Sequence, residues 1–276
     1  MSTFDEFATL LKIKRYAPNT IQTYIGLLVS FQKYLGDSLP LHRLEQHHLK
    51  QKVIQLIQDR NYAYATQKQL TSAIKLYLEL AHYKYVSFDR IAPRKPQRIL
   101  PDILSQQEVN RMFERTQNLK HRAMLMTTYA LGLRSGELTA LHIVNLDGDR
   151  NMIFIKAAKG KKDRNLPFPD KLKKTLRLYY KEYKPTNYLF EGRHGKQYTT
   201  TSLRKVFSTA VQRAGITKKV SLHSLRHAYA THLLEAGTDI RVIQKMLGHN
   251  SIKTTMLYTH VAQTEMNNVP SPLDFL

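Results

Sequence analysis

The chain has 276 residues, of which 42% are hydrophobic, so it is long enough to bury one large core or two smaller ones. It contains no cysteine, which excludes disulfides and thiolate metal sites. Its 43 Lys and Arg residues outnumber 21 Asp and Glu residues, and the formal net charge of +22 favours nucleic acid as partner, ahead of ribosomal or membrane-surface association. No apolar run approaches the roughly 20 residues of a membrane-spanning helix, and the N-terminus does not resemble a signal peptide, so we expect a cytoplasmic protein.

Residues 1–91 show apolar side chains at helical spacing. In the best example, Ile21, Tyr24, Leu28 and Leu35 share one helix face, and Gly36 marks the end of the helix. Similar periodicity recurs before and after this stretch. We therefore expect residues 1–91 to form a small helical bundle.

Residues 92–101 are predicted to be a linker, because Pro93, Pro96 and Pro101 prevent a continuous helix. The segment is also basic, and its cations are Arg94, Lys95 and Arg98. An extended basic linker can lie along a phosphate backbone, and a solvated connector is the alternative.

The second region, residues 102–276, opens with the capping-box pattern Ser105 to Glu108 and is predicted to be mainly helical. It is interrupted by β-branched and aromatic residues at 153–155 and 165–168, which flank a glycine turn and predict a β-hairpin or three-stranded sheet with a basic tip. Helices are then expected at 171–183, 200–214, 222–236, 239–247 and 251–258. The fold class is therefore mainly α with a small β-sheet.

Two short segments carry side chains suited to binding an anion. His223 and Arg226 are three residues apart on a predicted helix, so their side chains can reach a common anion, whereas His227 is interpreted as a packing residue on another face. Arg134 offers a planar fork of donors that suits phosphate, and the nearby Glu137 could hold that fork in position. Taken singly, each segment is more typical of an ordinary helix surface or helix end than of a binding site.

The predicted hairpin tip adds a cluster of cations, which are Lys159, Lys161, Lys162 and Arg164. A charged turn is usually only solvated, but a lysine on a hairpin can also deliver a charge and a proton to a phosphate. Lys159 directly precedes Gly160, whose backbone freedom permits a sharp turn.

Taken together, these segments resemble the tyrosine recombinases of the phage-integrase and Xer type. The motifs, in chain order, are "LRSGELTAL" with Arg134, "AKGKKDR" with Lys159, "HSLRH" with His223 and Arg226, "LGH" with His249, and "YTHV" with Tyr258. Each motif is weak alone, but their order and spacing together are specific. The resemblance implies a helical, SAM-like core-binding domain at 1–91 and an α+β catalytic domain at 102–276 that ends in an exchange tail from about 261.

The resemblance also implies roles for these residues. Arg134, Arg226 and His249 would hold the non-bridging oxygens of a scissile DNA phosphate, and Tyr258 would attack the phosphorus to give a 3′-phosphotyrosyl enzyme. Lys159 would protonate the leaving 5′ oxygen, and His223 is the candidate base, although the proton acceptor stays open. Glu137 would support Arg134, and the linker and hairpin cations would contact DNA. No metal, nucleotide or other cofactor is expected.

The implied partners are double-stranded DNA with paired recombination sites and further recombinase subunits, which form a tetramer of this chain alone or with a related recombinase. The apolar Leu273, Phe275 and Leu276 near the chain end are candidates for docking on a neighbour, or for folding onto their own domain. The family also implies association with the nucleoid. A DNA-binding regulator and a type IB topoisomerase are alternative functions, and integration, excision, dimer resolution and inversion stay equally open.

Overall fold

The computed structural model describes residues 3–36, 39–94, 96, 102–156 and 163–260. The chain divides into two compact units, Met1–Arg98 and Ile99–Leu276, each with its own hydrophobic core. The division falls inside the predicted linker 92–101, of which residues 95 and 97–101 lie outside the described residues. Within the described ranges, no helix has the length and apolar character needed to cross a membrane.

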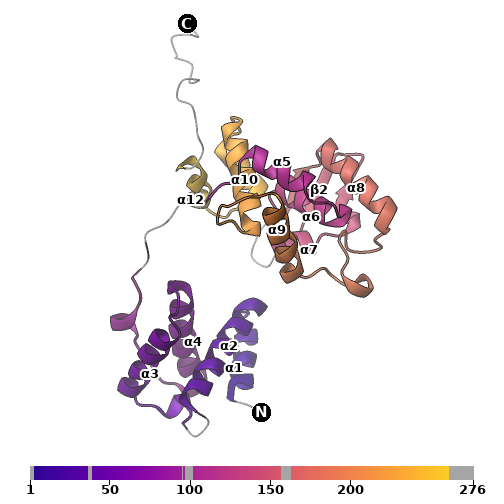
Figure 1. The fold of residues 1–276 in the computed structure, drawn as a ribbon. Coiled ribbons are helices and arrows are strands. Elements are labelled where there is room, and N and C mark those ends of the chain that lie inside the picture. Colours follow the sequence, from indigo (N-terminus) through magenta and orange to yellow (C-terminus); the bar gives the residue numbers. More distant parts are fainter. Residues whose placement is uncertain (1–2, 37–38, 95, 97–101, 157–162, 261–276) are drawn as a thin grey trace. The chain divides into compact units, whose positions relative to one another are not determined.

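The first unit is a helical bundle, as its sequence periodicity predicts (Figure 1). Its elements are α1 (Thr3–Ile13), α2 (Pro18–Leu35), η1 (Leu41–Arg43), α3 (Gln46–Asp59), α4 (Tyr64–His82) and η2 (Asp89–Ile91). The apolar faces of α1, α2 and α4 meet around Phe7, Phe31 and Tyr77, which are fully buried. The rings of Phe7 and Tyr77 pack edge to face with their centroids 5.3 Å apart, a favoured aromatic geometry.

The second unit is mainly helical and contains one small sheet. Its helices are α5 (Gln106–Glu114), α6 (Leu119–Ala130), α7 (Ser135–Thr139), η3 (Ile143–Asn145), α8 (Asp170–Tyr183), η4 (Arg193–Gly195), α9 (Thr200–Arg213), α10 (Leu222–Glu235), α11 (Ile240–Leu247), α12 (Ile252–Thr255) and η5 (Met256–His260). The capping box predicted at the start of α5 is present, because Ser105 and Glu108 exchange side-chain and backbone hydrogen bonds. The predicted fold class, mainly α with a small sheet, is confirmed.

The sheet is antiparallel with the order β1 (Leu146–Asp147), β2 (Met152–Ile155) and β3 (Arg164–Pro167). Ile153 pairs with Leu166, and both side chains are fully buried in the core of the second unit. Alternate residues face outward, so Phe154 is 39% exposed. The hairpin tip, residues 157–162, lies outside the described residues.

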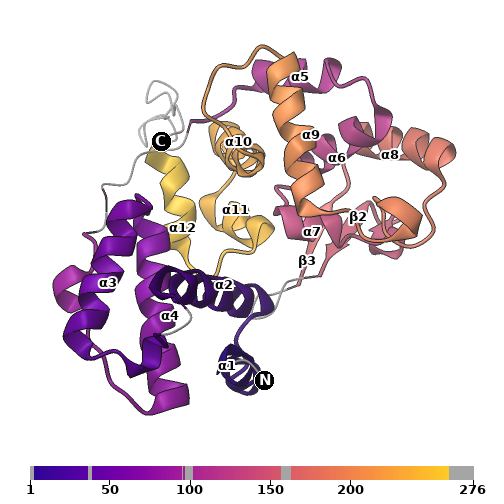
Figure 2. The ribbon, with the colours of Figure 1, turned by 60° about the horizontal axis from the view of Figure 1, so that its bottom comes forward.

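Helix α6 lies at the centre of the second unit and contacts α5, α8 and α10. None of its residues is exposed, as expected for a helix that has neighbours on several sides. Its buried Thr127 and Thr128 satisfy their hydroxyls by donating to the carbonyls of Ala123 and Met124, at 2.7 and 2.8 Å. Helices α10, α11 and α12 follow in chain order and lie close together at one end of this unit (Figure 2).

The chain turns sharply after α6 at Gly132, and this turn has no room for a side chain. Gly132 has φ of +56°, in the left-handed region, and a Cβ atom there would lie 2.5 Å from Tyr229 and 2.9 Å from Leu247. The turn thus lets the end of α6 approach both α10 and α11 closely.

We expect Gly132→Ala to lower the free energy of unfolding of the second unit by about 2 kcal/mol or more, because it adds backbone strain to a clash in a packed core. Chemical denaturation followed by circular dichroism measures this loss. Gly136→Ala is the matched control, because Gly136 lies in α7 and a Cβ atom there would meet no other atom within 4 Å. Equal stability of the two variants would contradict the account of this turn.

Candidate active site

Arg226 on α10 is fully buried, which is exceptional for an arginine. Its Nη1 donates to the carbonyl of Gly132 and its Nη2 to the carbonyl of Leu247, both at 2.6 Å. Its Nε has no hydrogen-bond partner among the described residues. Burial, followed by the neighbouring charge of Arg134, lowers the pKa of Arg226 to about 10, so the guanidinium stays charged at neutral pH. The protein thus holds a fixed cation whose Nε donor is unused.

Glu137 is the carboxylate that balances this charge, and only 5% of its side chain is exposed. It accepts hydrogen bonds from the backbone N–H and Nη1 of Arg134, both at 2.9 Å. It also accepts two from Arg164, at 3.2 and 2.9 Å, and lies 3.9 Å from Nη1 of Arg226. Burial alone would raise the pKa of Glu137, but the hydrogen bonds from Arg164 and Arg134 and their charges lower it to about 2. Glu137 is therefore ionised at neutral pH.

Arg134, Arg164 and Arg226 form an arginine cluster around Glu137. Arg134 directly precedes α7, and its side chain is the most accessible of the three, with 26% exposed. Its Nη1 contacts Glu137 and also the carbonyl of Leu247, at 3.4 Å. Leu247 therefore accepts hydrogen bonds from both Arg134 and Arg226. Last-turn carbonyls of a helix lack partners within the helix, so the end of α11 is suited to hold these cations.

Arg164 does not take the place expected for it on an exposed hairpin tip. It is the first residue of β3, and only 7% of its side chain is exposed. Besides its two bonds to Glu137, its Nε donates to the carbonyl of Met246 at 2.7 Å. The cause is strand alternation, which puts Arg164 on the same face as the buried Leu166, two residues later. Arg164 is therefore a buried partner of Glu137 and not part of a solvated turn, whereas its contact with DNA stays a prediction.

His249 follows Gly248, which ends α11 with φ of 62° in the left-handed region. The ring is half-buried, and its Nδ1 lies 2.9 Å from the hydroxyl of Thr255. Burial, and then the charges of Arg226 and Arg134, lower the pKa of His249 to about 3. The imidazole is therefore neutral at physiological pH, and it stands beside the arginine cluster.

Tyr258 lies in η5 and is 2% exposed. Its ring packs in a small apolar cluster with Tyr229, Ala230, Ile243 and Leu247. Its hydroxyl lies 3.2 Å from Nδ1 of His227. Burial raises the pKa of Tyr258 even though Arg226 and Arg134 act to lower it, so the phenol is protonated in this state.

The prediction that His227 lies on another face from His223 is wrong, although its ring does pack against neighbouring rings. His223 and His227 are four residues apart on α10, a spacing that puts them on the same face, and their ring centroids are 4.5 Å apart. The centroid of His227 also lies 5.6 Å from that of Tyr258. Burial lowers the pKa of both histidines, that of His227 to about 4, with Arg226 acting in the same direction. The i, i+4 spacing is the sequence signal that could have found this contact.

The structure does not place most of the other expected site residues. Lys95, Arg98, Lys159, Lys161 and Lys162 lie outside the described residues. Arg94 is described and exposed. Within the described ranges, no group of three or more His, Cys, Asp or Glu side chains is arranged to hold a metal ion.

An opening of about 830 Å³ leads from solvent to His249 and Arg164. Exposed cations that the motifs did not single out, Arg241 and Lys245 of α11, line it together with Gln244. Their i, i+4 spacing places them on one face of α11, just before His249. This surface presents positive charge at the mouth of the site.

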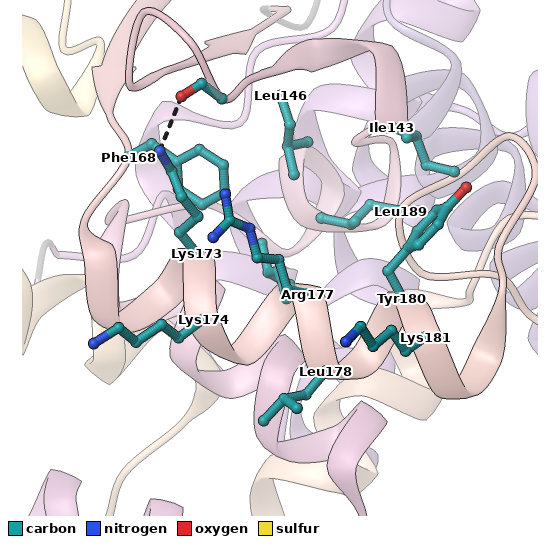
Figure 3. A pocket seen from close by; sticks show the side chains of 12 residues that line it. Ile143, Leu146, Phe168, Lys173, Lys174, Arg177, Leu178, Tyr180, Lys181 and Leu189 are labelled. Atoms are coloured by element: carbon teal, nitrogen blue, oxygen red, sulfur yellow. Dashed lines mark hydrogen bonds between the residues drawn. The ribbon is translucent and has the colours of Figure 1, made fainter.

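A separate groove of about 580 Å³ lies along α8 and shares no residue with the arginine cluster (Figure 3). Its walls include the apolar Ile143, Leu146 and Leu189, and α8 contributes several cations along one side. One of these, Lys173, donates to the carbonyl of Gly148 at 2.9 Å. The groove therefore combines apolar walls with several cations along α8.

Comparison with known proteins assigns both units. Residues 102–265 match the phage integrase family, and residues 4–86 match the phage integrase N-terminal SAM-like domain. The chain is 32% identical over 286 residues to the tyrosine recombinase XerD of Oceanobacillus iheyensis. The aligned region covers 96% of this chain and 95% of that protein. It is 30% identical over 267 residues to a tyrosine recombinase of Thermosipho africanus, with 93% of each protein covered.

Solved structures show the same fold. The crystal structure of XerA recombinase covers 96% of this chain and 95% of its own, with 27% identity and a TM-score of 0.56. The XerH site-specific recombinase bound to palindromic difH substrate, in a post-cleavage complex, covers 92% of this chain and 80% of its own, with 21% identity and a TM-score of 0.72. The chain therefore belongs to the phage integrase family and is a site-specific tyrosine recombinase of the Xer type, an enzyme that transfers DNA strands.

Proposed function

We propose that the cluster around Arg226 binds the scissile phosphate of double-stranded DNA and that Tyr258 is the nucleophile that cleaves it. The observation that carries the proposal is the fully buried Arg226, whose Nε has no partner among the described residues although its Nη1 and Nη2 each donate a hydrogen bond. A buried donor without a partner is costly, and an anion that enters the site would satisfy it.

The net charge of the cluster fits a phosphate in its transition state. Arg134, Arg164 and Arg226 surround the single carboxylate of Glu137, which leaves an excess of two positive charges. A phosphodiester carries one negative charge, and the pentacoordinate state reached by phenolate attack carries two. In many enzymes, hydrogen-bond donors that are already in place around the developing charge make the largest contribution to stabilising the transition state. In this arrangement Arg134, Arg226 and His249 contact the non-bridging oxygens, and Glu137 holds the arginines in place.

The proposed reaction exchanges one phosphoester for another. The phenol of Tyr258 gives up its proton, its oxygen bonds to phosphorus, and the bond to the 5′ oxygen breaks, leaving a 3′-phosphotyrosyl enzyme and a 5′-hydroxyl. Lys159, on the hairpin tip, is proposed to protonate the leaving oxygen, and His223 is the candidate acceptor of the phenolic proton. The phenol needs help because its ordinary pKa is about 10. Rejoining is the reverse reaction with another strand, so no cofactor takes part.

The proposed partners are two recombination sites in double-stranded DNA and a tetramer of subunits, either copies of this chain or with a related recombinase. The DNA-bound state of the XerH relative supports DNA as the partner.

The unit at 1–91 is proposed as the core-binding domain, with Arg94, Lys95 and Arg98 of the linker and Lys161 and Lys162 of the hairpin tip contacting phosphates. The tail from about 261 is proposed to dock on a neighbouring subunit. Cleavage would then depend on the assembly of the subunits. In the cell, the enzyme is proposed to associate with the nucleoid.

The nucleophile is tested with a nicked suicide substrate that carries a site selected from random DNA. We expect the wild type to form a covalent adduct that persists in denaturing gels and Tyr258→Phe to form none, because only the hydroxyl is removed. Tyr229→Phe is the matched control, since Tyr229 packs in the same apolar cluster, and it should retain the adduct. An adduct that survives Tyr258→Phe would overturn the assignment.

The role of Arg226 is tested by Arg226→Lys, which keeps the charge but removes the planar fork of donors. We expect adduct formation to slow by about 100-fold or more, the usual effect of losing a donor to a developing oxyanion. Binding of the uncleaved site, measured by gel mobility shift, should change far less, because many phosphate contacts contribute to it. A rate within a few fold of the wild type would contradict the proposal.

The role of Glu137 is tested by Glu137→Gln, which leaves three arginines without their carboxylate. We expect the free energy of unfolding at pH 7 to fall by about 3 kcal/mol or more, as when one partner of a buried ion pair is removed. The pKa of Glu137 is held at about 2, so its contribution is present above the unfolded value of about 4.3 and is lost as pH falls toward 2. The variant should therefore also lose part of the pH dependence of stability in that interval. Chemical denaturation at several pH values measures both effects. Glu182→Gln is the control, because Glu182 is an exposed residue of α8. Equal free energies of unfolding of the two variants would contradict this role.

A further inference from the structure

The segment formed by residues 252–260 contacts the site through two hydroxyl groups, and each lies against a histidine. Thr255 reaches Nδ1 of His249 at 2.9 Å, and Tyr258 reaches Nδ1 of His227 at 3.2 Å. The contact of Tyr258 involves the nucleophile itself. The contact of Thr255 has no part in the chemistry described above, although Thr255 is fully buried beside a phosphate-binding residue.

The protonation state of His249 restricts what this histidine can do. Burial and the surrounding cations, Arg226 and Arg134 first and then His223 and Arg164, lower its pKa to about 3, so the ring is neutral at working pH. A neutral imidazole has one N–H donor and one nitrogen acceptor. To donate to an anionic phosphate oxygen, His249 must carry its proton on the nitrogen that faces the phosphate. The neutral ring therefore serves the reaction in only one of its two tautomers.

The hydrogen bond with Thr255 selects between those tautomers. Among the described residues, His249 is the only hydrogen-bond partner of the Thr255 hydroxyl, which is fully buried. If Nδ1 carried the proton, the hydroxyl hydrogen of Thr255 would have no acceptor within this part of the structure, and an unsatisfied buried donor is costly. The hydroxyl therefore donates to Nδ1, and the proton of His249 resides on Nε2.

The position of the ring agrees with this assignment. His249 is half-buried, and its Nδ1 edge is directed at a side chain with no exposed surface. His249 also lines the opening, and among the described residues Nε2 is the ring nitrogen without a hydrogen-bond partner, so it is the one that remains to bind a phosphate. The donor is therefore presented where the proposed phosphate enters.

We propose that Thr255 is a positioning residue for strand cleavage, which fixes His249 in the tautomer that presents Nε2–H to a non-bridging oxygen of the scissile phosphate. The inference rests on the proposed function of the site. Thr255 and Tyr258 belong to the same segment, three residues apart, so the segment that brings the nucleophile also sets the donor on His249. Correct seating of the segment then supplies both groups together.

The first test measures the rate of adduct formation on the suicide substrate for three variants. Thr255→Val removes the hydroxyl while keeping the branched shape. We expect it to slow cleavage by about 10-fold or more, because a ring protonated on Nδ1 loses its hydrogen bond to the charged phosphate oxygen. Thr255→Ser restores the hydroxyl and should recover most of the rate. Thr254→Val is the matched control, because Thr254 is the exposed neighbour on α12, and it should cleave like the wild type.

The second test observes the tautomer directly, by NMR of the full chain with ¹⁵N-labelled histidine. The signals of His249 are assigned by their loss in His249→Gln. We expect the wild type to show a protonated Nε2 and an unprotonated Nδ1, and Thr255→Val to shift that population toward Nδ1–H. A purely structural role of Thr255 would leave the tautomer unchanged.

The outcomes separate this inference from the function on which it rests. If the wild type forms no covalent adduct on any selected site, the proposed function fails. If the wild type cleaves but its His249 carries the proton on Nδ1, the inference fails and the proposed function stands. It also fails if Thr255→Val cleaves at the rate of Thr254→Val. The wild-type spectrum decides the point even if Thr255→Val does not fold.

Discussion

The buried carboxylate of Glu137 is the group on which the rest of the site depends. Arg134, Arg164 and Arg226 come from the start of α7, from β3 and from α10, and their like charges would repel one another in a dry interior. One carboxylate that accepts hydrogen bonds from two of them and lies beside the third makes their proximity tolerable. Because the balance is incomplete, the folded site retains an excess of positive charge. The enzyme thus holds in its resting fold the positive charge that the proposed phosphate would neutralise.

Most of the architecture could be predicted from the sequence, because helical periodicity and capping residues are local signals. The helices at 171–183, 200–214 and 222–236 agree with α8, α9 and α10 to within a residue at each end. The membership of Arg134, Arg226, His249 and Tyr258 in one cluster was predicted only through the resemblance to a family. Spacing alone could not bring together residues that are separated by up to 124 positions in the chain.

The errors in the prediction arise where side-chain direction or tertiary contact decides. Arg164 was placed with the lysines of the hairpin tip because its charge is typical of a solvated turn, but its register in β3 turns it inward to Glu137. His227 was assigned to packing although its spacing from His223 indicates a shared face. The hydroxyl of Thr255 had no sequence signal, since its contact with His249 requires the turn at Gly248.

The carbonyls that hold Arg226 have a further consequence. Gly132 and Leu247 contribute backbone oxygens from the ends of α6 and α11, and Leu247 also accepts from Arg134. Every residue type has a backbone carbonyl, so substitution of the side chain at position 247 leaves the acceptor itself in place. The orientation of Arg226 is therefore encoded in the path of the main chain, whereas Arg134 is held by the side chain of Glu137 as well. A change of side chain at position 247 can for this reason leave the arrangement around Arg226 unchanged.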